Sequence, residues 1–156
     1  MWPCPIDLRM LLPVHKRAVR LHLLSLSDDD RRARFGHALS DTALVRWCDR
    51  AMHNGHFWWG AWAAHDGGLC AALQLCPTGH EGVWELGLSV AQPMRWRGLG
   101  TALLDDALRH LPQVQQVVCH HGHPAIVRMA QRLGYTLQTQ GDPPRFRLIA
   151  PMGGRI

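Results

Sequence analysis

The most distinctive segment of the chain combines basic side chains with closely spaced glycines. Arg95 and Arg97 precede Gly98 and Gly100, and Thr101 follows where an amphipathic helix begins. Glycine lacks the Cβ atom that would hold an anion away from the main chain, and the first N–H groups of a helix attract negative charge. Arginine adds a fixed charge and fork-shaped donors. The segment therefore predicts a strand, an anion-binding loop and a helix that together seat a pyrophosphate.

The common nucleotide-binding loops do not fit this spacing. The P-loop needs a lysine after its second glycine, but the only lysine of the chain is Lys16. The dinucleotide fingerprint needs a third glycine or alanine where Leu103 stands.

The loop instead resembles the acetyl-CoA loop of the GNAT N-acetyltransferase superfamily, which is written [QR]-x-x-G-x-[GA]. Here the pattern is Arg95-x-x-Gly98-x-Gly100. The strand sequence at 85–90 and the later segment at 132–135 strengthen the resemblance, which covers nearly the whole chain. It implies a single GNAT domain over the full length, residues 1 to 156.

Hydrophobic periodicity and turn residues predict a strand, helices, three strands, a helix, a strand, a helix and two strands. The expected strands are 8–12, 56–64, 69–75, 83–90, 114–120, 135–137 and 146–149, and the expected helices are 14–26, 28–35, 42–53, 98–110 and 124–133. This order matches the GNAT-like α/β fold. The resemblance implies a mixed, mostly antiparallel sheet of about seven strands flanked by about four to five helices.

The resemblance also implies that acetyl-CoA, the acyl donor, lies in a V-shaped gap beside the strand that precedes the loop. Leu88 and Val90 would offer main-chain groups to the acetyl and pantetheine arm. The cofactor-binding residues implied are Leu88, Val90, Arg95, Arg97, Gly98, Gly100, Thr101 and His123, the last at the position where the family often has asparagine. Thr101 is equally compatible with an ordinary residue at a helix N-terminus.

Transfer to an amine needs a base for the ammonium proton and a donor for the oxyanion, and the departing thiolate can take a proton. Glu85 is the candidate base, because many GNAT enzymes have a carboxylate on this strand and its neighbours Trp84 and Leu86 are apolar. The alternative is a surface glutamate on the outer face of the strand. The N–H of Leu88 is the oxyanion donor by analogy.

The family's usual acid is a tyrosine, but Ala130 occupies its position. The only tyrosine, Tyr135, falls where the family has an aromatic residue that packs. Either the thiolate leaves unassisted or through water, or His121 substitutes, or the protein is a poor catalyst.

Two further patterns have both a functional and a structural interpretation. Cys119-His120-His121-x-His123 has metal-binding residue types, but a histidine-rich loop at the acceptor end is the favoured interpretation, and we expect no metal. The tryptophans at 58, 59 and 62 could line an acceptor pocket, although core positions are favoured.

Composition narrows the function classes. The chain has 156 residues, a net charge of +5, and five cysteines with no C-x-x-C pair, which suggests reduced thiols in a cytoplasm. A bacterial source is implied only by the resemblance, through the segment at 23–41. No segment is long and apolar enough for a membrane span, and the N-terminus does not look like a signal peptide. The positive charge invites a nucleic-acid hypothesis, but acidic residues 28–30 accompany the densest arginines at 31–34, which favours a solvated helix.

The leading hypothesis is acetyl-CoA-dependent N-acetyltransfer to a primary amine of a small molecule or protein, by direct attack in a ternary complex; a homodimer is compatible with it. The alternatives are an acyl-CoA-binding module with little or no catalysis, motivated by Ala130 and His123, and a basic nucleic-acid-binding protein.

Overall fold

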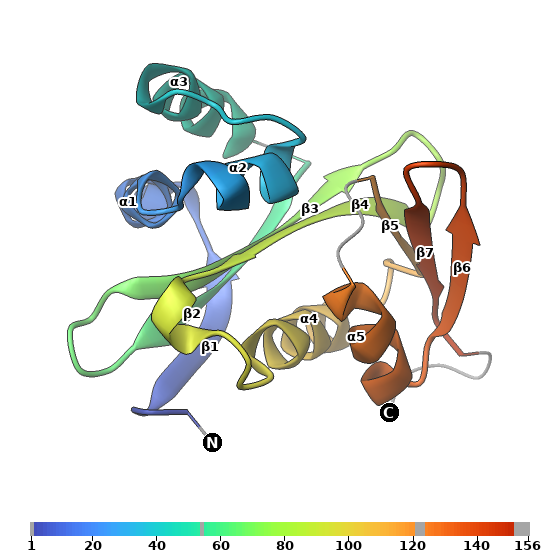
Figure 1. The fold of residues 1–156 in the computed structure, drawn as a ribbon. Coiled ribbons are helices and arrows are strands. Elements are labelled where there is room, and N and C mark those ends of the chain that lie inside the picture. Colours follow the sequence, from blue (N-terminus) through green and yellow to red (C-terminus); the bar gives the residue numbers. More distant parts are fainter. Residues whose placement is uncertain (1, 54, 121–123, 152–156) are drawn as a thin grey trace.

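The computed structural model of the protein describes residues 2–53, 55–120 and 124–151. Within these residues the chain forms a single seven-stranded sheet and five α-helices (Figure 1). The strands are β1 (Ile6–Leu11), β2 (Phe57–Ala63), β3 (Leu69–Pro77), β4 (Val83–Val90), β5 (Gln116–Cys119), β6 (Thr136–Gln140) and β7 (Arg145–Ile149). The helices are α1 (Lys16–Leu24), α2 (Asp28–Phe35), α3 (Asp41–Ala51), α4 (Leu99–His110) and α5 (Ala125–Leu133). None of the helices in the described part of the chain has the length and apolar character to cross a bilayer.

The strands lie in the order β1-β2-β3-β4-β5-β7-β6. Every neighbouring pair is antiparallel except β4 and β5, which run parallel. The mixed, mostly antiparallel GNAT-like sheet predicted from the sequence is therefore confirmed, as are the order and type of its elements.

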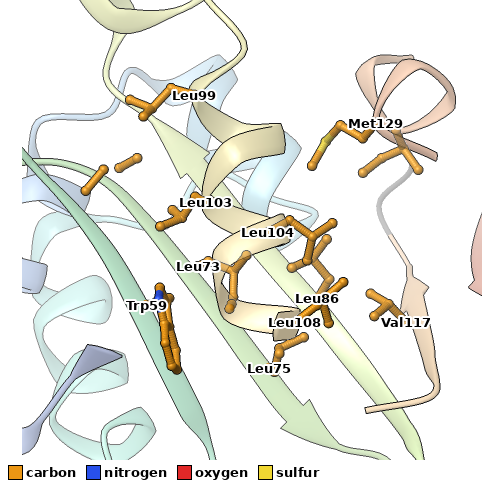
Figure 2. Close-up of a cluster of buried hydrophobic side chains, with 14 of the residues drawn as sticks. Trp59, Leu73, Leu75, Leu86, Leu99, Leu103, Leu104, Leu108, Val117 and Met129 are labelled. Atoms are coloured by element: carbon orange, nitrogen blue, oxygen red, sulfur yellow. The ribbon is translucent and has the colours of Figure 1, made fainter. Parts of the chain in front are cut away.

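Helices cover both faces of the sheet (Figure 1): α1, α2 and α3 lie on one face, and α4 and α5 lie on the other. On the second face, Leu103 and Leu104 of α4 pack over Leu73, Leu75 and Leu86 of the central strands (Figure 2). All five side chains are buried. A second cluster fills the first face, and it includes Leu11, Val19, Leu23, Leu44, Cys48, Met52 and Trp58.

The ends of the helices follow from local chemistry. Ser27 Oγ accepts the N–H of Asp30, and Ser40 Oγ accepts the N–H of Ala43, so each serine caps the helix that follows. Gly36 closes α2 in the left-handed conformation at φ 86°. Helix α1 starts later than predicted, since a 3₁₀ turn at Pro13–His15 precedes it.

Helix α2 is exposed to solvent on one face, as predicted, but its other face packs inward. Arg31 is only 6% exposed, pairs with Asp41 at 2.8 Å and donates to three main-chain carbonyl groups. Arg34, three residues along, lies on the same inward face, because helical positions i and i+3 are neighbours. Arg32 alone of the helix's three arginines is exposed, beside Asp29. The basic residues of α2 therefore do not form one outward patch for nucleic acid.

We expect Leu103→Ala to lower the free energy of unfolding by about 2–5 kcal/mol, because the side chain is fully buried between α4 and the sheet. Urea denaturation measures this change. The matched control is Leu21→Ala on α1, where the side chain is 57% exposed and the expected change is within about 0.5 kcal/mol. Equal effects of the two substitutions would contradict the packing described here.

Candidate functional site

The sheet opens at its centre, between β4 and β5. Strand β4 pairs with β3 from Trp84 to Val90, but it pairs with β5 only from Val83 to Glu85. From Leu86 onward, no strand of the described part of the chain pairs with the side of β4 that faces away from β3. Main-chain groups on this edge are available to a ligand.

The hydrogen-bond alternation of the β3–β4 pair shows which groups face this opening. The N–H of Ala91 donates to the carbonyl of Cys70 at 2.8 Å, so the odd-numbered residues of β4 bond to β3. The main-chain groups of Leu88 and Val90 therefore point to the open side. The Val90 carbonyl confirms this direction, because it accepts a hydrogen bond from Arg95 Nε at 2.9 Å.

The loop after β4 brings the start of α4 to the end of this open edge. Gly98 is the N-cap residue of α4, in the left-handed conformation at φ 76°, and no side chain caps the helix there. Gly100 allows close contact between helix and strand, since a Cβ atom at this position would lie 3.2 Å from Leu88 Cδ2. The first N–H groups of α4 therefore lie beside β4 without a side-chain cap.

A cavity of about 460 Å³ follows the open edge from this loop toward the middle of the sheet. Six of the residues predicted to bind the cofactor line it: Leu88, Val90, Arg95, Gly98, Gly100 and Thr101, and the predicted base Glu85 lines it as well. Arg97 is exposed and does not line the cavity; its carbonyl accepts a hydrogen bond from Trp2 Nε1 at 3.2 Å. The structure thus brings together all these residues except Arg97.

Arg95 already has protein partners. Besides the Val90 carbonyl, its Nη2 donates to Asp30 Oδ2 of α2 at 2.7 Å. This hydrogen bond lowers the pKa of Asp30. Arg95 therefore fastens the loop to both β4 and α2, in addition to adding positive charge to the cavity.

Two arginines of α5, Arg128 and Arg132, also line the cavity, and the sequence analysis missed them. A Cβ atom at Gly98 would come within 3.2 Å of Arg132 Nη1, and the guanidinium of Arg128 lies 5.5 Å from the Trp96 ring centroid. The sequence did contain a signal for them: their i, i+4 spacing places both side chains on the face of α5 that also carries Met129. The cavity therefore has cations of α5 close to the glycine loop.

Glu85 lies at the end of β4 where the pairing with β5 stops. Its Oε2 is 3.6 Å from His120 Nε2, and the two side chains are 43% and 41% exposed. The apolar setting expected from its sequence neighbours is wrong, because alternate strand residues face opposite sides and Trp84 and Leu86 pack toward the α4 core. The carboxylate faces α2 beside a histidine instead.

His22 of α1 lies behind β4 on the same face. Its Nε2 is 2.8 Å from Ser89 Oγ, and the imidazole is 4% exposed. The pKa of His22 is lowered to about 4, mainly by burial and also by the positive charges of Arg34 and Arg95. The ring is therefore neutral at pH 7.

A second cavity, of about 390 Å³, adjoins the first on the side of α2 and α3. Both cavities are lined by Arg34, Gln74, Cys76 and Glu85, and the second adds Phe35, Trp47, Arg50, Ala51 and His56. The tryptophans at 58, 59 and 62 do not line either cavity, in agreement with the favoured core interpretation; 58 and 59 are each 3% exposed. Trp47, which the sequence analysis did not select, is the tryptophan that faces this cavity.

His121 and His123 lie outside the described residues, so their expected roles stay predictions. Cys119 is 5% exposed, and burial raises the pKa of its thiol to about 12. Among the described residues, no three side chains of the metal-binding types gather at one point.

The family comparison agrees with this geometry. The model of the Acetyltransferase (GNAT) family matches residues 21–135, which is most of the chain. The chain belongs to the GNAT acetyltransferase family. A search of curated proteins gave no match.

Solved structures of GNAT proteins share the fold. The GNAT domain of S. lividans PAT has a TM-score of 0.70 at 17% identity, over 92% of this chain and 88% of that one. Spermidine N-acetyltransferase from Vibrio cholerae, in complex with CoA and spermine, has a TM-score of 0.68 at 15% identity, over 92% and 95%. A phosphinothricin acetyltransferase from Sinorhizobium meliloti, in complex with AcCoA, has a TM-score of 0.67 at 13% identity, over 96% and 95%.

By the resemblance, this chain has Ala130 at the position of the family's general acid. Ala130 is 1% exposed in the core of α5, and its carbonyl accepts the N–H of Tyr135 at 2.9 Å. Tyr135 packs against the same core. Neither residue lines either cavity.

The buried His22 predicts a pH dependence of stability. Between its folded pKa of about 4 and its ordinary value of 6.5, the unfolded chain binds a proton that the folded chain does not, so stability rises with pH in this range. From pH 7 to pH 5 we expect the wild type to lose about 2 kcal/mol from this group. Urea denaturation at the two pH values should show a smaller loss for His22→Gln. The exposed control His37→Gln should keep the wild-type dependence, and an unchanged dependence in His22→Gln would contradict the assignment.

Proposed function

We propose that the protein transfers an acetyl group from acetyl-CoA to a primary amine, by direct attack of the amine in a ternary complex. The observation that carries this proposal is the open edge of β4 from Leu86 to Val90, which leads to the uncapped start of α4. GNAT membership supports use of an acyl-CoA donor. The amine acceptor and the acetyl group are the parts proposed here.

Charge and shape both support phosphate binding at the loop. The linked phosphates of CoA would accept hydrogen bonds from the main-chain N–H groups at the start of α4, where the helix dipole is positive. Arg128 and Arg132 of α5, which lie close to the loop, would neutralise the same charges. The pantetheine arm would then extend along the main-chain groups of Leu88 and Val90.

In the proposed reaction, Glu85 accepts the proton of the substrate ammonium, and His120 beside it holds or relays that proton. The amine nitrogen then attacks the thioester carbonyl carbon, and a C–N bond forms. The N–H of Leu88 donates to the oxyanion. The C–S bond breaks and the thiolate departs, and the nitrogen loses its second proton to Glu85, which has passed the first through His120 to solvent. Ala130 stands at the position of the family's usual tyrosine acid and has no proton to give to the thiolate.

A second candidate function is acyl-CoA binding with little or no catalysis. The buried Ala130 favours it, because the family's usual acid is absent from α5. The two functions differ in one measurement. Release of free thiol from acetyl-CoA in the presence of amines supports transfer, whereas binding without release supports the second candidate.

We expect Arg132→Gln to weaken acetyl-CoA binding about 10- to 100-fold, because one charge-assisted hydrogen bond to phosphate is lost. Isothermal titration calorimetry measures the dissociation constant. Arg109→Gln is the matched control, since its side chain is 62% exposed on α4 and pairs with Asp105. If the wild type does not bind acetyl-CoA, both candidate functions are wrong.

We expect Glu85→Gln to lower the rate of thiol release about 10²- to 10⁴-fold, the usual contribution of a general base. Acetyl-CoA binding should stay unchanged, because the carboxylate is remote from the phosphate loop. Glu81→Gln, at an exposed position before β4, serves as the control. Wild-type turnover by Glu85→Gln would show that the base assignment is wrong.

A further inference from the structure

The arginines of α2 differ in their partners. Arg31 pairs with Asp41, and Arg32 pairs with Asp29. Within the described residues, no carboxylate oxygen lies within 4.0 Å of the Arg34 nitrogens. Arg34 therefore places a positive charge inside the protein without a negative partner at contact distance.

The surroundings hold this guanidinium in a fixed position. Its Nη2 donates to Gln74 Oε1 at 2.8 Å, and Gln74 is 3% exposed on β3. The guanidinium carbon lies 4.7 Å from the ring centroid of Phe35 and 5.3 Å from that of Trp47. Burial lowers the pKa of Arg34 to about 10, so the group still carries its charge at neutral pH.

A glycine on β4 makes room for this arrangement. A Cβ atom at Gly87 would overlap the guanidinium of Arg34, so the flat group lies against bare main chain. Gly87 is two residues from Glu85 on the same face of the strand, about 7 Å along it. Arg34 and the proposed base Glu85 are therefore neighbours whose opposite charges interact without contact, and both line the two cavities.

An arginine with most of its five donors unused is suited to a planar oxyanion, which it binds through two parallel hydrogen bonds. The phosphates of CoA belong to the other end of β4, at the glycine loop. The anion beside Gly87 must then come from the acceptor. We propose that the acceptor is an amine that also carries a carboxylate, with the amine at Glu85 and the carboxylate at Arg34. This inference rests on the proposed N-acetyltransfer and names its substrate class.

Matched pairs of amines test the inference on the wild-type protein. The panel is alanine, glutamate, lysine, tryptophan and 4-aminobutyrate, each compared with the analogue in which the backbone or terminal carboxylate is a carboxamide. We expect kcat/KM for thiol release to be about 10- to 100-fold higher for the carboxylate member of the preferred pair, mainly through KM. Equal kcat/KM values within every pair would overturn the inference.

The variant Arg34→Gln should remove this preference. It keeps a partner for Gln74 but loses the charge, so KM for the carboxylate substrate should rise about 10- to 100-fold while the carboxamide values stay near wild type. Arg34→Lys, which keeps the charge without the fork, should retain part of the preference. Arg32→Gln, at a side chain that is 59% exposed on the same helix, is the matched control and should keep all of it. A preference that survives Arg34→Gln would overturn the inference.

Calorimetric titration of the same pairs into the wild type saturated with CoA separates this inference from the proposed function. Tighter binding of carboxylate members without thiol release would overturn N-acetyltransfer and support the carboxylate site. Thiol release with no carboxylate preference would support N-acetyltransfer and overturn the site. If the carboxylate members bind no more tightly and no thiol is released, N-acetyltransfer and the carboxylate site are both overturned.

Discussion

Within the described residues, strand β4 has a paired strand on both sides only at Trp84 and Glu85, and from Leu86 to Val90 it pairs with β3 alone. Buried main-chain N–H and C=O groups need partners, and an open edge in the middle of a sheet cannot obtain them from a strand. Arg95 satisfies one such group, the Val90 carbonyl. The rest of the edge borders a cavity, and the other features of the site are arranged around this interruption of the sheet.

The packing on the α4 face fixes the geometry of that cavity. Leu103 and Leu104 hold α4 against the central strands, and the absence of a side chain at Gly100 lets the first turn of the helix approach Leu88. The helix start is therefore held beside the open edge by hydrophobic contacts that face away from the cavity. Loss of that packing would disturb the phosphate loop without changing any residue in it.

The sequence was sufficient to predict the order of elements and the glycine loop, because hydrophobic periodicity and glycine spacing are local signals. It was not sufficient to predict which arginine is buried, as Arg31 is, or which arginines line the cavity, as Arg34, Arg128 and Arg132 do. Arg31, Arg34, Arg128 and Arg132 look like ordinary surface residues in the sequence, and only the packing of α2 and α5 on the sheet reveals where they lie. Likewise the pairing of Glu85 with His120 depends on the parallel register of β4 and β5, a contact between distant segments.

Helix α2 has a part in both halves of the site. Asp30 holds Arg95 of the glycine loop, and Arg34, one turn later on the same helix, lies against Gly87 and lines both cavities. The two side chains therefore project from a single helical turn. The seating of this one short helix on the sheet sets the place of the glycine loop and of the buried guanidinium at the same time.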